Sequence, residues 1–300
     1  MLGHEKINFL YLPTPLERLN HLSQDLGINL YIKRDDLTPL AMGGNKLRKL
    51  EYLLADAKKQ GATMLLTVGG AQTNHGRLTC AGELSANLLL DGMMGCDVWL
   101  RKPDPTGQKS EAQLFDETVA EVTARYEAQG EKVYFIPIGG SNELGILGYY
   151  ECAQEIAKQA DKMALINGPD AKKFPRVIST VGGIGISPKP NGLQAYAKNY
   201  FDKICAYYHL DPAKTENITA ASFDLTDKYD RGAYNNPCKE VREAMYLMAE
   251  REALILDPCY TGKCFAGLLE MVKNGEIAQG ETVIFLHTGG APGINTPFHR

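Results

Sequence analysis

Short apolar runs that end in paired glycines alternate along this chain with segments of helical periodicity, and this alternation restricts the fold more than any other feature. Residues 64–68 run into Gly69-Gly70, and residues 283–286 run into His287-Thr288-Gly289-Gly290. Apolar runs of this length are typical of strands that are buried on both faces. Strands that alternate with helices indicate an α/β protein with mainly parallel sheets, whose ligands collect at the carboxyl ends of the strands.

The same patterns predict the other elements. Leucines recur at helical spacing after Lys46, and Gly61 ends that helix. Further helices are expected from near Gln72, over 147–158 and over 239–253. Further strands are expected at 29–33, 97–100, 133–136, 176–180 and 184–186.

Composition excludes several classes of protein. A hydrophobic fraction of 44% and a charged fraction of 23% are ordinary for a soluble globular chain. The net charge of -4 comes without a basic stripe, which argues against nucleic acid as a partner. No apolar run approaches the ~20 residues that span a bilayer, and the charged N-terminus lacks the apolar region of a signal peptide. We therefore expect a cytoplasmic protein with no membrane partner.

The cysteines point the same way. The chain has seven, an odd number, and no Cys-x-x-Cys pair. This pattern argues against a disulfide framework and against a zinc site, and it is typical of reduced thiols in a cytosolic protein.

Gly43-Gly44-Asn45-Lys46 is the first candidate for chemistry. Two glycines let the backbone approach a ligand closely, and the helix N-terminus that follows favours anions. The positive end of the helix also favours a neutral lysine amine, which Schiff-base chemistry needs. Taken alone, Lys46 fits a surface lysine at a helix start better, because Lys49, Lys58 and Lys59 follow it.

Other segments are individually weak. Gln72 to His75 and Gly139 to Asn142 follow predicted strands, and both also fit ordinary turns with a helix N-cap. Lys263 in the segment Asp257 to Lys263 could be a second catalytic amine, but a solvated lysine at a helix start explains it better. His75 and His287 lack a nearby carboxylate in the sequence, so we interpret them as hydrogen-bonded structural residues and expect no metal site.

Together and in this order, the segments resemble one family. They are similar to the D-cysteine desulfhydrase and 1-aminocyclopropane-1-carboxylate deaminase group, which belongs to the tryptophan-synthase-β-like, fold type II pyridoxal phosphate enzymes. The likeness covers most of the chain and is carried by residues 13–19, 32–37, 43–51, 72–75, 137–142, 257–263 and 287–290.

The resemblance implies two open, mainly parallel sheets flanked by helices, and two domains. A large domain of residues 1–46 and 147–300 would bind pyridoxal 5′-phosphate. A small domain of residues 47–146 would pack over it, with the cofactor in the cleft between the two domains. A small amino acid is the implied substrate, and a homodimer is usual in the family.

The resemblance also implies roles for individual residues. Lys46 would hold the cofactor covalently and then remove the Cα proton, Asn45 and Asn74 would contact the cofactor, and Tyr260 would pack on the pyridine face. Thr288 would meet the pyridine nitrogen, beside Thr261. The substrate would be bound by Gln72, Thr73, Asn74 and His75, with the Thr73 hydroxyl at its carboxylate, and the phosphate loop would begin with Thr180, Gly182 and Gly183.

This sequence departs from the family at two places. Gly183 runs directly into an apolar segment, although parallel strands need a crossover of about a dozen residues or more. The helix expected from Gln72 similarly has little room before Gly82. We therefore predict that the sequence is interrupted near Ala81 and Gly183, where the family has a helix, a strand and most of the phosphate loop.

Thr261 decides between the branches of the family. The deaminase branch has Glu at this position, whose carboxylate would keep the pyridine nitrogen protonated, whereas Thr261 is neutral. The resemblance therefore implies β-elimination, with D-cysteine giving pyruvate, sulfide and ammonia. A 1-aminocyclopropane-1-carboxylate deaminase or another β-substituted-alanine lyase stays an alternative.

Two classes outside this chemistry stay open as well. A nicotinamide-dependent oxidoreductase would also place glycine-rich turns after strands, but the Gly-x-Gly-x-x-Gly fingerprint is absent from the sequence. A non-catalytic protein that binds pyridoxal phosphate is the other alternative.

Overall fold

A sheet of four strands lies within one part of the chain. The computed structural model describes residues 3–69, 93–102, 104–165, 175–179, 192–211, 226–233, 236 and 238–295. The strand order of this sheet is β1 (Leu16–Arg18), β2 (Asn29–Arg34), β6 (Thr282–His287) and β5 (Arg176–Ile178). β2 and β5 both run parallel to β6, and the short β1 is antiparallel to β2.

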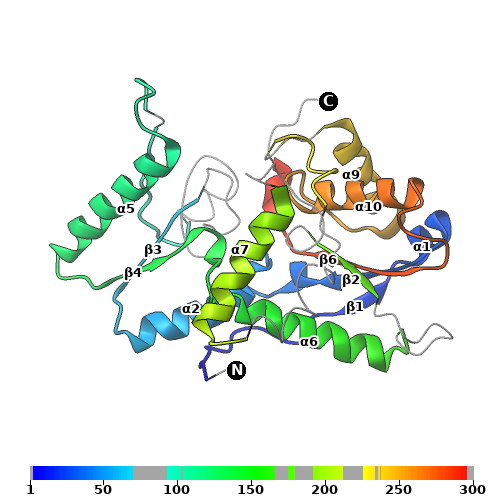
Figure 1. The fold of residues 1–300 in the computed structure, drawn as a ribbon, viewed down its shortest axis with the longest axis horizontal. Coiled ribbons are helices and arrows are strands. Elements are labelled where there is room, and N and C mark those ends of the chain that lie inside the picture. Colours follow the sequence, from blue (N-terminus) through cyan, green and yellow to red (C-terminus); the bar gives the residue numbers. More distant parts are fainter. Residues whose placement is uncertain are drawn as a thin grey trace. The chain divides into compact units, whose positions relative to one another are not determined.

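A second sheet pairs β3 (Met64–Thr67) with β4 (Val133–Ile136) in parallel. Helix α2 (Lys46–Lys59) precedes β3, and helix α5 (Glu111–Glu127) precedes β4 (Figure 1). Ser110 and Gln113 form a capping box at the start of α5, which satisfies backbone N–H groups that a helix start leaves open. The predicted α/β class with two mainly parallel sheets is confirmed.

The chain divides into two compact units. One is Met1–Leu10 with Lys46–Tyr149, and the other is Tyr11–Asn45 with Tyr150–Arg300. The sequence-based division assigns all of residues 1–46 to the large domain, whereas the structure groups the first ten with α2. The carboxylate of Glu51 on α2 explains this, because it accepts hydrogen bonds from Lys6 Nζ and from the backbone N–H groups of Phe9 and Leu10.

The hydrophobic core of the second unit lies between its sheet and two helices, α9 (Lys239–Glu252) and α10 (Thr261–Lys273) (Figure 1). Side chains alternate along a strand, so Leu30 and Ile32 face this core while Lys33 points the other way. Lys33 Nζ contacts Glu155 and Gln159 on α6 (Leu147–Lys162), at 2.9 and 2.7 Å. Helices thus cover both faces of the sheet.

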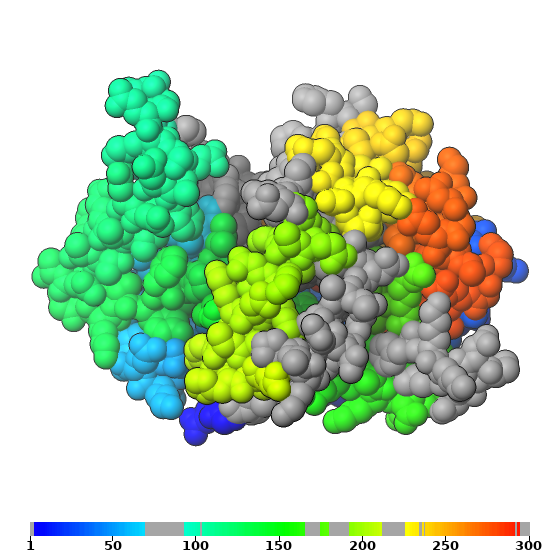
Figure 2. All heavy atoms as spheres, viewed as in Figure 1, coloured from blue at the N-terminus to red at the C-terminus, as the bar shows by residue number. Residues whose placement is uncertain are grey.

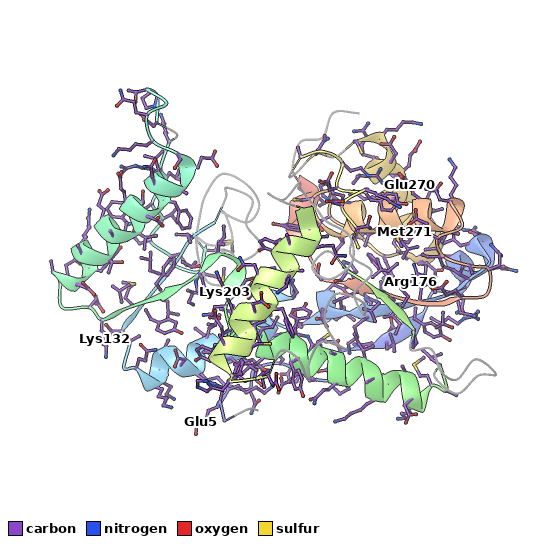
Figure 3. The ribbon with its side chains drawn as sticks, in the orientation of Figure 1. Glu5, Lys132, Arg176, Lys203, Glu270 and Met271 are labelled. Atoms are coloured by element: carbon purple, nitrogen blue, oxygen red, sulfur yellow. The ribbon has the colours of Figure 1, made fainter. Side chains whose placement is uncertain are left out.

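Helix α10 shows the same division of faces between neighbouring residues. Met271 is buried in the core, whereas Glu270 beside it pairs with Arg231 at 2.7 Å (Figure 3). Arg176, labelled on β5 in the same view, pairs with Glu281 at 2.9 Å. The polar sides of these elements are thereby held in place by ion pairs.

The remaining elements are short or lie at the surface. Helix α7 (Gly192–Tyr207) buries Cys205 alone among its residues and is largely open to solvent in Figure 2. The others are α1 (Asn20–Leu26) and the short 3-10 helices η1 (Asp35–Leu37), η2 (Ile138–Gly140) and η4 (Ala291–Asn295).

Two expectations meet a different outcome. The strand predicted at residues 97–100 is wrong, because these residues form no regular structure and Leu100 is 63% exposed. The strand predicted at 184–186 and the helix predicted from Gln72 lie outside the described residues. In the part of the chain that the structure describes, no helix is long and apolar enough to span a membrane.

Candidate active site

The turn before Lys46 is fixed by close backbone contacts. Gly43 has a φ of 70°, and a Cβ added there would lie 2.0 Å from the carbonyl oxygen of Asp36. The hydroxyl of Thr38 accepts a hydrogen bond of 2.7 Å from the Gly44 N–H and lies 3.1 Å from the Gly44 carbonyl oxygen. The Thr38 hydroxyl therefore contacts both backbone polar groups of Gly44. Helix α2 begins at Lys46, the position that the sequence predicts.

The end of β6 lies against this turn. The backbone N–H of Asn45 donates to the carbonyl oxygen of Thr288 at 3.0 Å. Gly289 has a φ of 88°, and a Cβ added to it would meet the Gly44 Cα at 2.6 Å. The structure thus brings together two predicted segments, around Asn45 and around Thr288, that are more than two hundred residues apart in the sequence.

A buried carboxylate organises the start of α10. Asp257 is 1% exposed and accepts hydrogen bonds from the backbone N–H groups of Cys259, Tyr260 and Thr261, at 2.8 to 3.0 Å. Its carboxylate also lies 2.8 Å from the position that a Cβ on Gly290 would take. Asp257 therefore links the predicted residues Tyr260 and Thr261 to the glycine turn that follows Thr288.

Protonation of Asp257 is governed by opposing effects. Burial raises the pKa of this carboxyl above its usual value, while the hydrogen bonds from Thr261, Tyr260 and Cys259 act to lower it. Burial is the larger effect, so the pKa of Asp257 lies above its usual value although the backbone N–H groups, which can only donate, favour the charged form. The start of α10 also offers a positive dipole end to this charge.

Lys49 lies one turn beyond Lys46 on α2, in the same unit as Lys46. Lys49 Nζ donates to the Ser141 hydroxyl at 2.8 Å and to the Gly139 carbonyl oxygen at 3.1 Å. Burial, and secondarily the charge of Lys46, lower the pKa of Lys49 to about 7. Among the described residues no carboxylate pairs with it, so its charge has no compensation there.

Gly139 also approaches Lys46 itself. A Cβ added to Gly139, whose φ is 68°, would lie 3.7 Å from the Lys46 Cε. The Gly139–Ser141 turn therefore packs on the Lys46 side chain and holds the Lys49 ammonium at the same time. The sequence singles out this turn but assigns it no place in the site.

Lys263 corrects one interpretation. The sequence allows a solvated lysine at the start of a helix, but Lys263 is fully buried. Its Nζ donates to the carbonyl oxygens of Asp230 and Ala233 at 2.9 and 2.7 Å, and burial lowers its pKa. Lys263 thereby ties the turn at residues 230–233 to α10.

His287 is a hydrogen-bonded structural residue, as predicted. Its Nε2 lies 3.1 Å from the Ile255 carbonyl oxygen, its Nδ1 accepts from the Gly289 N–H, and burial lowers its pKa. No group of metal-ligating side chains occurs within the described residues. The six cysteines that the structure describes are all free thiols.

Seven predicted site residues lie outside the described part of the chain: Gln72, Thr73, Asn74, His75, Thr180, Gly182 and Gly183. The two predicted interruptions, near Ala81 and Gly183, lie there too. The described residues of the predicted site are Asn45, Lys46, Tyr260, Thr261 and Thr288.

In the unit that contains β6, a threonine hydroxyl and a glycine-bracketed turn lie at the end of a parallel strand, where backbone groups suit an anionic ligand. In the unit that contains α2, Lys46 offers an amine of the kind that carbonyl-bearing cofactors need. A model of the family described as pyridoxal-phosphate dependent enzyme matches residues 7–187, more than half of the chain. The chain belongs to the pyridoxal-phosphate-dependent enzymes. This family membership confirms two predictions from the sequence: the cofactor is pyridoxal phosphate, and the protein is an enzyme that depends on it.

Relatives within this family are similar over almost their whole length. The D-cysteine desulfhydrase of Serratia proteamaculans (strain 568) is 36% identical over 317 residues, which cover 94% of this chain and 92% of that protein. The D-cysteine desulfhydrase of Klebsiella pneumoniae (strain 342) is also 36% identical, over 319 residues that cover 96% of this chain and 95% of that protein. The Serratia alignment is longer than the 300 residues of this chain, so it includes positions where this chain has no residue.

A solved structure agrees with the fold. A crystal structure of an ACC deaminase homologue is 29% identical, has a TM-score of 0.80, and the match covers 97% of this chain and 93% of that one. The predicted tryptophan-synthase-β-like fold of type II is therefore confirmed.

Three residues that hold the turns of the candidate site escape prediction from the sequence. Asp257 stands there only as the first residue of a segment, and Thr38 and Lys49 have no predicted role. Each acts through hydrogen bonds to a turn whose conformation the sequence does not show. The signal that could have found Asp257 is its position four residues before Thr261 at a helix start, where carboxylates cap backbone N–H groups.

Proposed function

We propose that this protein is a carbon–sulfur lyase that converts D-cysteine and water into pyruvate, sulfide and ammonia. The observation that carries the proposal is Lys46 at the first position of α2, behind the Gly43-Gly44 turn that Thr38 and Gly289 hold in place. The 36% identity to D-cysteine desulfhydrases over nearly the whole chain supports the choice of substrate.

The described residues fit the cofactor. Lys49 is a buried lysine whose pKa is lowered to about 7 and which pairs with no carboxylate among the described residues, so an anionic group such as a phosphate beside it would favour its charged form. Lys46 offers the amine that this cofactor needs, and Thr288 offers a hydroxyl. When bound, pyridoxal phosphate supplies the electron sink for breaking the C–H bond at the substrate Cα.

The residues of this chain would then act on the substrate as follows. The Lys46 amine takes the proton from Cα, which releases the thiol at Cβ as sulfide. Tyr260, whose backbone N–H donates to Asp257 at 2.9 Å, would lie against the pyridine face. We propose that Asn45, Asn74, Thr261 and Thr288 contact the ring, that Thr180, Gly182 and Gly183 begin the phosphate site, and that Gln72, Thr73, Asn74 and His75 bind the substrate.

A second candidate is the opening of 1-aminocyclopropane-1-carboxylate. The solved ACC deaminase homologue with a TM-score of 0.80 supports it. The neutral Thr261 argues against it, because the deaminase branch has a glutamate at this position. A ring nitrogen without a facing carboxylate favours rapid loss of a β-substituent.

We also propose the wider setting of the enzyme. The cofactor would lie between a large and a small domain, and the protein would act as a homodimer in the cytoplasm. Free thiols at six described cysteines support a reducing compartment. Sedimentation of the purified protein tests the dimer.

Pyruvate release from a matched panel of substrates tests the proposed reaction. The panel holds D-cysteine, L-cysteine, other β-substituted alanines and 1-aminocyclopropane-1-carboxylate, with sulfide measured in parallel and Lys46→Ala as the control. We expect sulfide and pyruvate in equal amounts from D-cysteine, faster than any product from the cyclopropane. Turnover of the cyclopropane with no action on D-cysteine would refute the proposal, and cofactor binding without any turnover would favour a non-catalytic binding protein.

A further inference from the structure

The ring of His287, at the end of β6, has a different hydrogen-bond partner on each of its two nitrogens. Nδ1 lies 3.3 Å from the backbone nitrogen of Gly289, and Nε2 lies 3.1 Å from the carbonyl oxygen of Ile255. All three residues belong to the unit that contains β6. His287 is 2% exposed, so water does not replace either partner.

These two partners fix the protonation of the ring. A backbone N–H can only donate a hydrogen bond, and a backbone carbonyl can only accept one. Nδ1 therefore has to be free of a proton to accept from Gly289, and Nε2 has to carry a proton to donate to Ile255. The form that satisfies both partners is the neutral imidazole with its proton on Nε2.

The surroundings of the ring favour the same neutral form. Burial lowers the pKa of His287 below its ordinary value of 6.5 and is the largest effect on it. Asp36, Arg34 and Asp257 are the ionisable side chains that act on the ring from neighbouring elements. The nearest carboxylate oxygen, of Asp36, lies 3.8 Å from Nε2, and Arg34 holds this carboxylate through contacts of 2.8 to 3.2 Å.

The two nitrogens of the ring hold different parts of the fold. Nδ1 holds Gly289, and a Cβ added to Gly289 would lie 2.6 Å from the Cα and 3.3 Å from the nitrogen of Gly44. Gly44 stands two residues before Lys46, in the turn that leads into α2. Nε2 instead holds Ile255, in the connection between α9 and α10. The contact with the lysine turn therefore depends on Nδ1 alone.

We propose that His287 is a positioning residue for the turn before Lys46, and that its unprotonated Nδ1 acts by holding Gly289 against Gly44. The inference rests on the proposed function, because the turn matters to the reaction only if Lys46 is the amine that receives the cofactor. His287 acts through Gly289 and needs no contact of its own with cofactor or substrate. Loss of the Nδ1 acceptor should therefore slow the attachment of the cofactor, whereas loss of the Nε2 donor should not.

Two substitutions separate the two nitrogens. Asparagine carries its amide oxygen as many bonds from Cβ as Nδ1, so His287→Asn keeps an acceptor for Gly289. Glutamine carries its amide N–H groups as many bonds from Cβ as Nε2, so His287→Gln keeps a donor for Ile255 and offers no acceptor in place of Nδ1. His21→Asn is the control, because the side chain of His21 on α1 is 65% exposed and pairs with Glu252.

Three quantities are measured for each protein. The first is the rate at which the visible absorption of attached pyridoxal phosphate appears after mixing, and the second is the dissociation constant of the cofactor. The third is hydrogen exchange in the cofactor-free protein, followed by mass spectrometry of the peptides that contain residues 40–46 and 285–290. Exchange in these peptides shows whether Gly289 and the turn before Lys46 are held.

We expect His287→Gln to attach the cofactor about fivefold to tenfold more slowly than wild type and to bind it more weakly by a similar factor. Both of its peptides should exchange faster than those of wild type. His287→Asn should stay close to wild type in all three quantities, and so should His21→Asn. A general loss of stability would instead impair the asparagine and glutamine variants alike, because each loses one hydrogen bond of the ring.

The proposal is overturned if His287→Asn and His287→Gln are equally impaired, or if His287→Gln attaches the cofactor as wild type does. Should His287→Gln fail to fold, His287→Asn decides: attachment at the wild-type rate supports the proposal, and attachment as slow as that expected for glutamine overturns it. A wild-type protein that binds no pyridoxal phosphate refutes the proposed function. That failure is distinct, because hydrogen exchange without cofactor still shows whether Nδ1 holds the turn.

Discussion

The backbone N–H of Asn45 donates a hydrogen bond of 3.0 Å to the carbonyl oxygen of Thr288. Lys46 is the next residue in the chain, and Thr288 directly follows β6. One backbone contact therefore joins the segment that supplies the proposed catalytic amine to the segment that supplies the proposed hydroxyl. The glycines on either side, Gly44 and Gly289, allow the approach because neither has a Cβ.

Gly289→Ala should break this approach. Its Cβ would lie 2.6 Å from the Gly44 Cα, and alanine would be strained at a φ of 88°. We expect a loss of about 1–3 kcal/mol in the free energy of unfolding, and slower attachment of the cofactor. Urea unfolding of the cofactor-free protein measures the first effect.

Gly280→Ala is the matched control, because Gly280 has a φ of 76° and nothing within 4 Å of an added Cβ. It carries the backbone strain without the clash. Equal destabilisation by the two variants would mean that the contact between Gly289 and Gly44 contributes nothing.

Thr38→Val should loosen the turn before Lys46. Valine has no oxygen to accept the Gly44 N–H, which Thr38 now accepts at 2.7 Å in a buried setting. An unsatisfied buried N–H costs about 1–3 kcal/mol, and we expect that loss in urea unfolding. Thr38→Ser keeps the oxygen and should recover most of the stability. A serine variant as unstable as the valine variant would show that the methyl group matters and the hydroxyl does not.

Much of the fold follows from apolar patterning. The helices at α2 and α9 and the strands β3, β4 and β6 lie where the spacing of leucines, methionines and β-branched residues predicts them. The elements that escape prediction are mostly exposed. α7 buries Cys205 alone among its residues, and α5 buries Val122 alone, so neither has a strong apolar stripe.

The prediction of a strand at residues 97–100 is wrong although the local sequence favours a strand. Its Val-Trp-Leu run has strand propensity, but Trp99 stacks with Arg125 of α5, with the guanidinium 4.5 Å from the ring centroid. Tertiary context thus overrides local preference.

The candidate site divides in the same way. Short ordered motifs in the sequence single out Lys46, Tyr260, Thr261 and Thr288, whose roles stay predictions. The roles of Thr38, Lys49 and Asp257 could not be predicted, because they depend on hydrogen bonds to turns and on burial. No local pattern shows that the Thr261 hydroxyl lies 2.7 Å from the Asp257 carboxylate.

Lys49 should make stability depend on pH. Its pKa is about 7 in the folded protein, against an ordinary value of 10.5 for a lysine, so between these two values the unfolded chain binds more protons. The free energy of unfolding should therefore increase as the pH rises from 7 toward 10, by up to about 1.4 kcal/mol per pH unit. Below pH 7, Lys49 should not make the free energy of unfolding depend on pH.

Lys49→Met should remove this rise, which urea unfolding of the cofactor-free protein at several pH values measures. Lys59→Met is the control, since Lys59 is exposed on the same helix and should keep the wild-type slope. A Lys49→Met protein whose stability still climbs as wild type does would show that Lys49 stays protonated in the folded state.

Borohydride reduction followed by peptide mapping tests the central claim most directly. The protein is mixed with pyridoxal phosphate, reduced, digested and searched for the lysine that carries the cofactor, with Lys46→Ala treated in parallel. We predict a single labelled peptide with the label on Lys46, and none in the variant. A label on Lys263, or a protein that carries no label at all, would contradict the account.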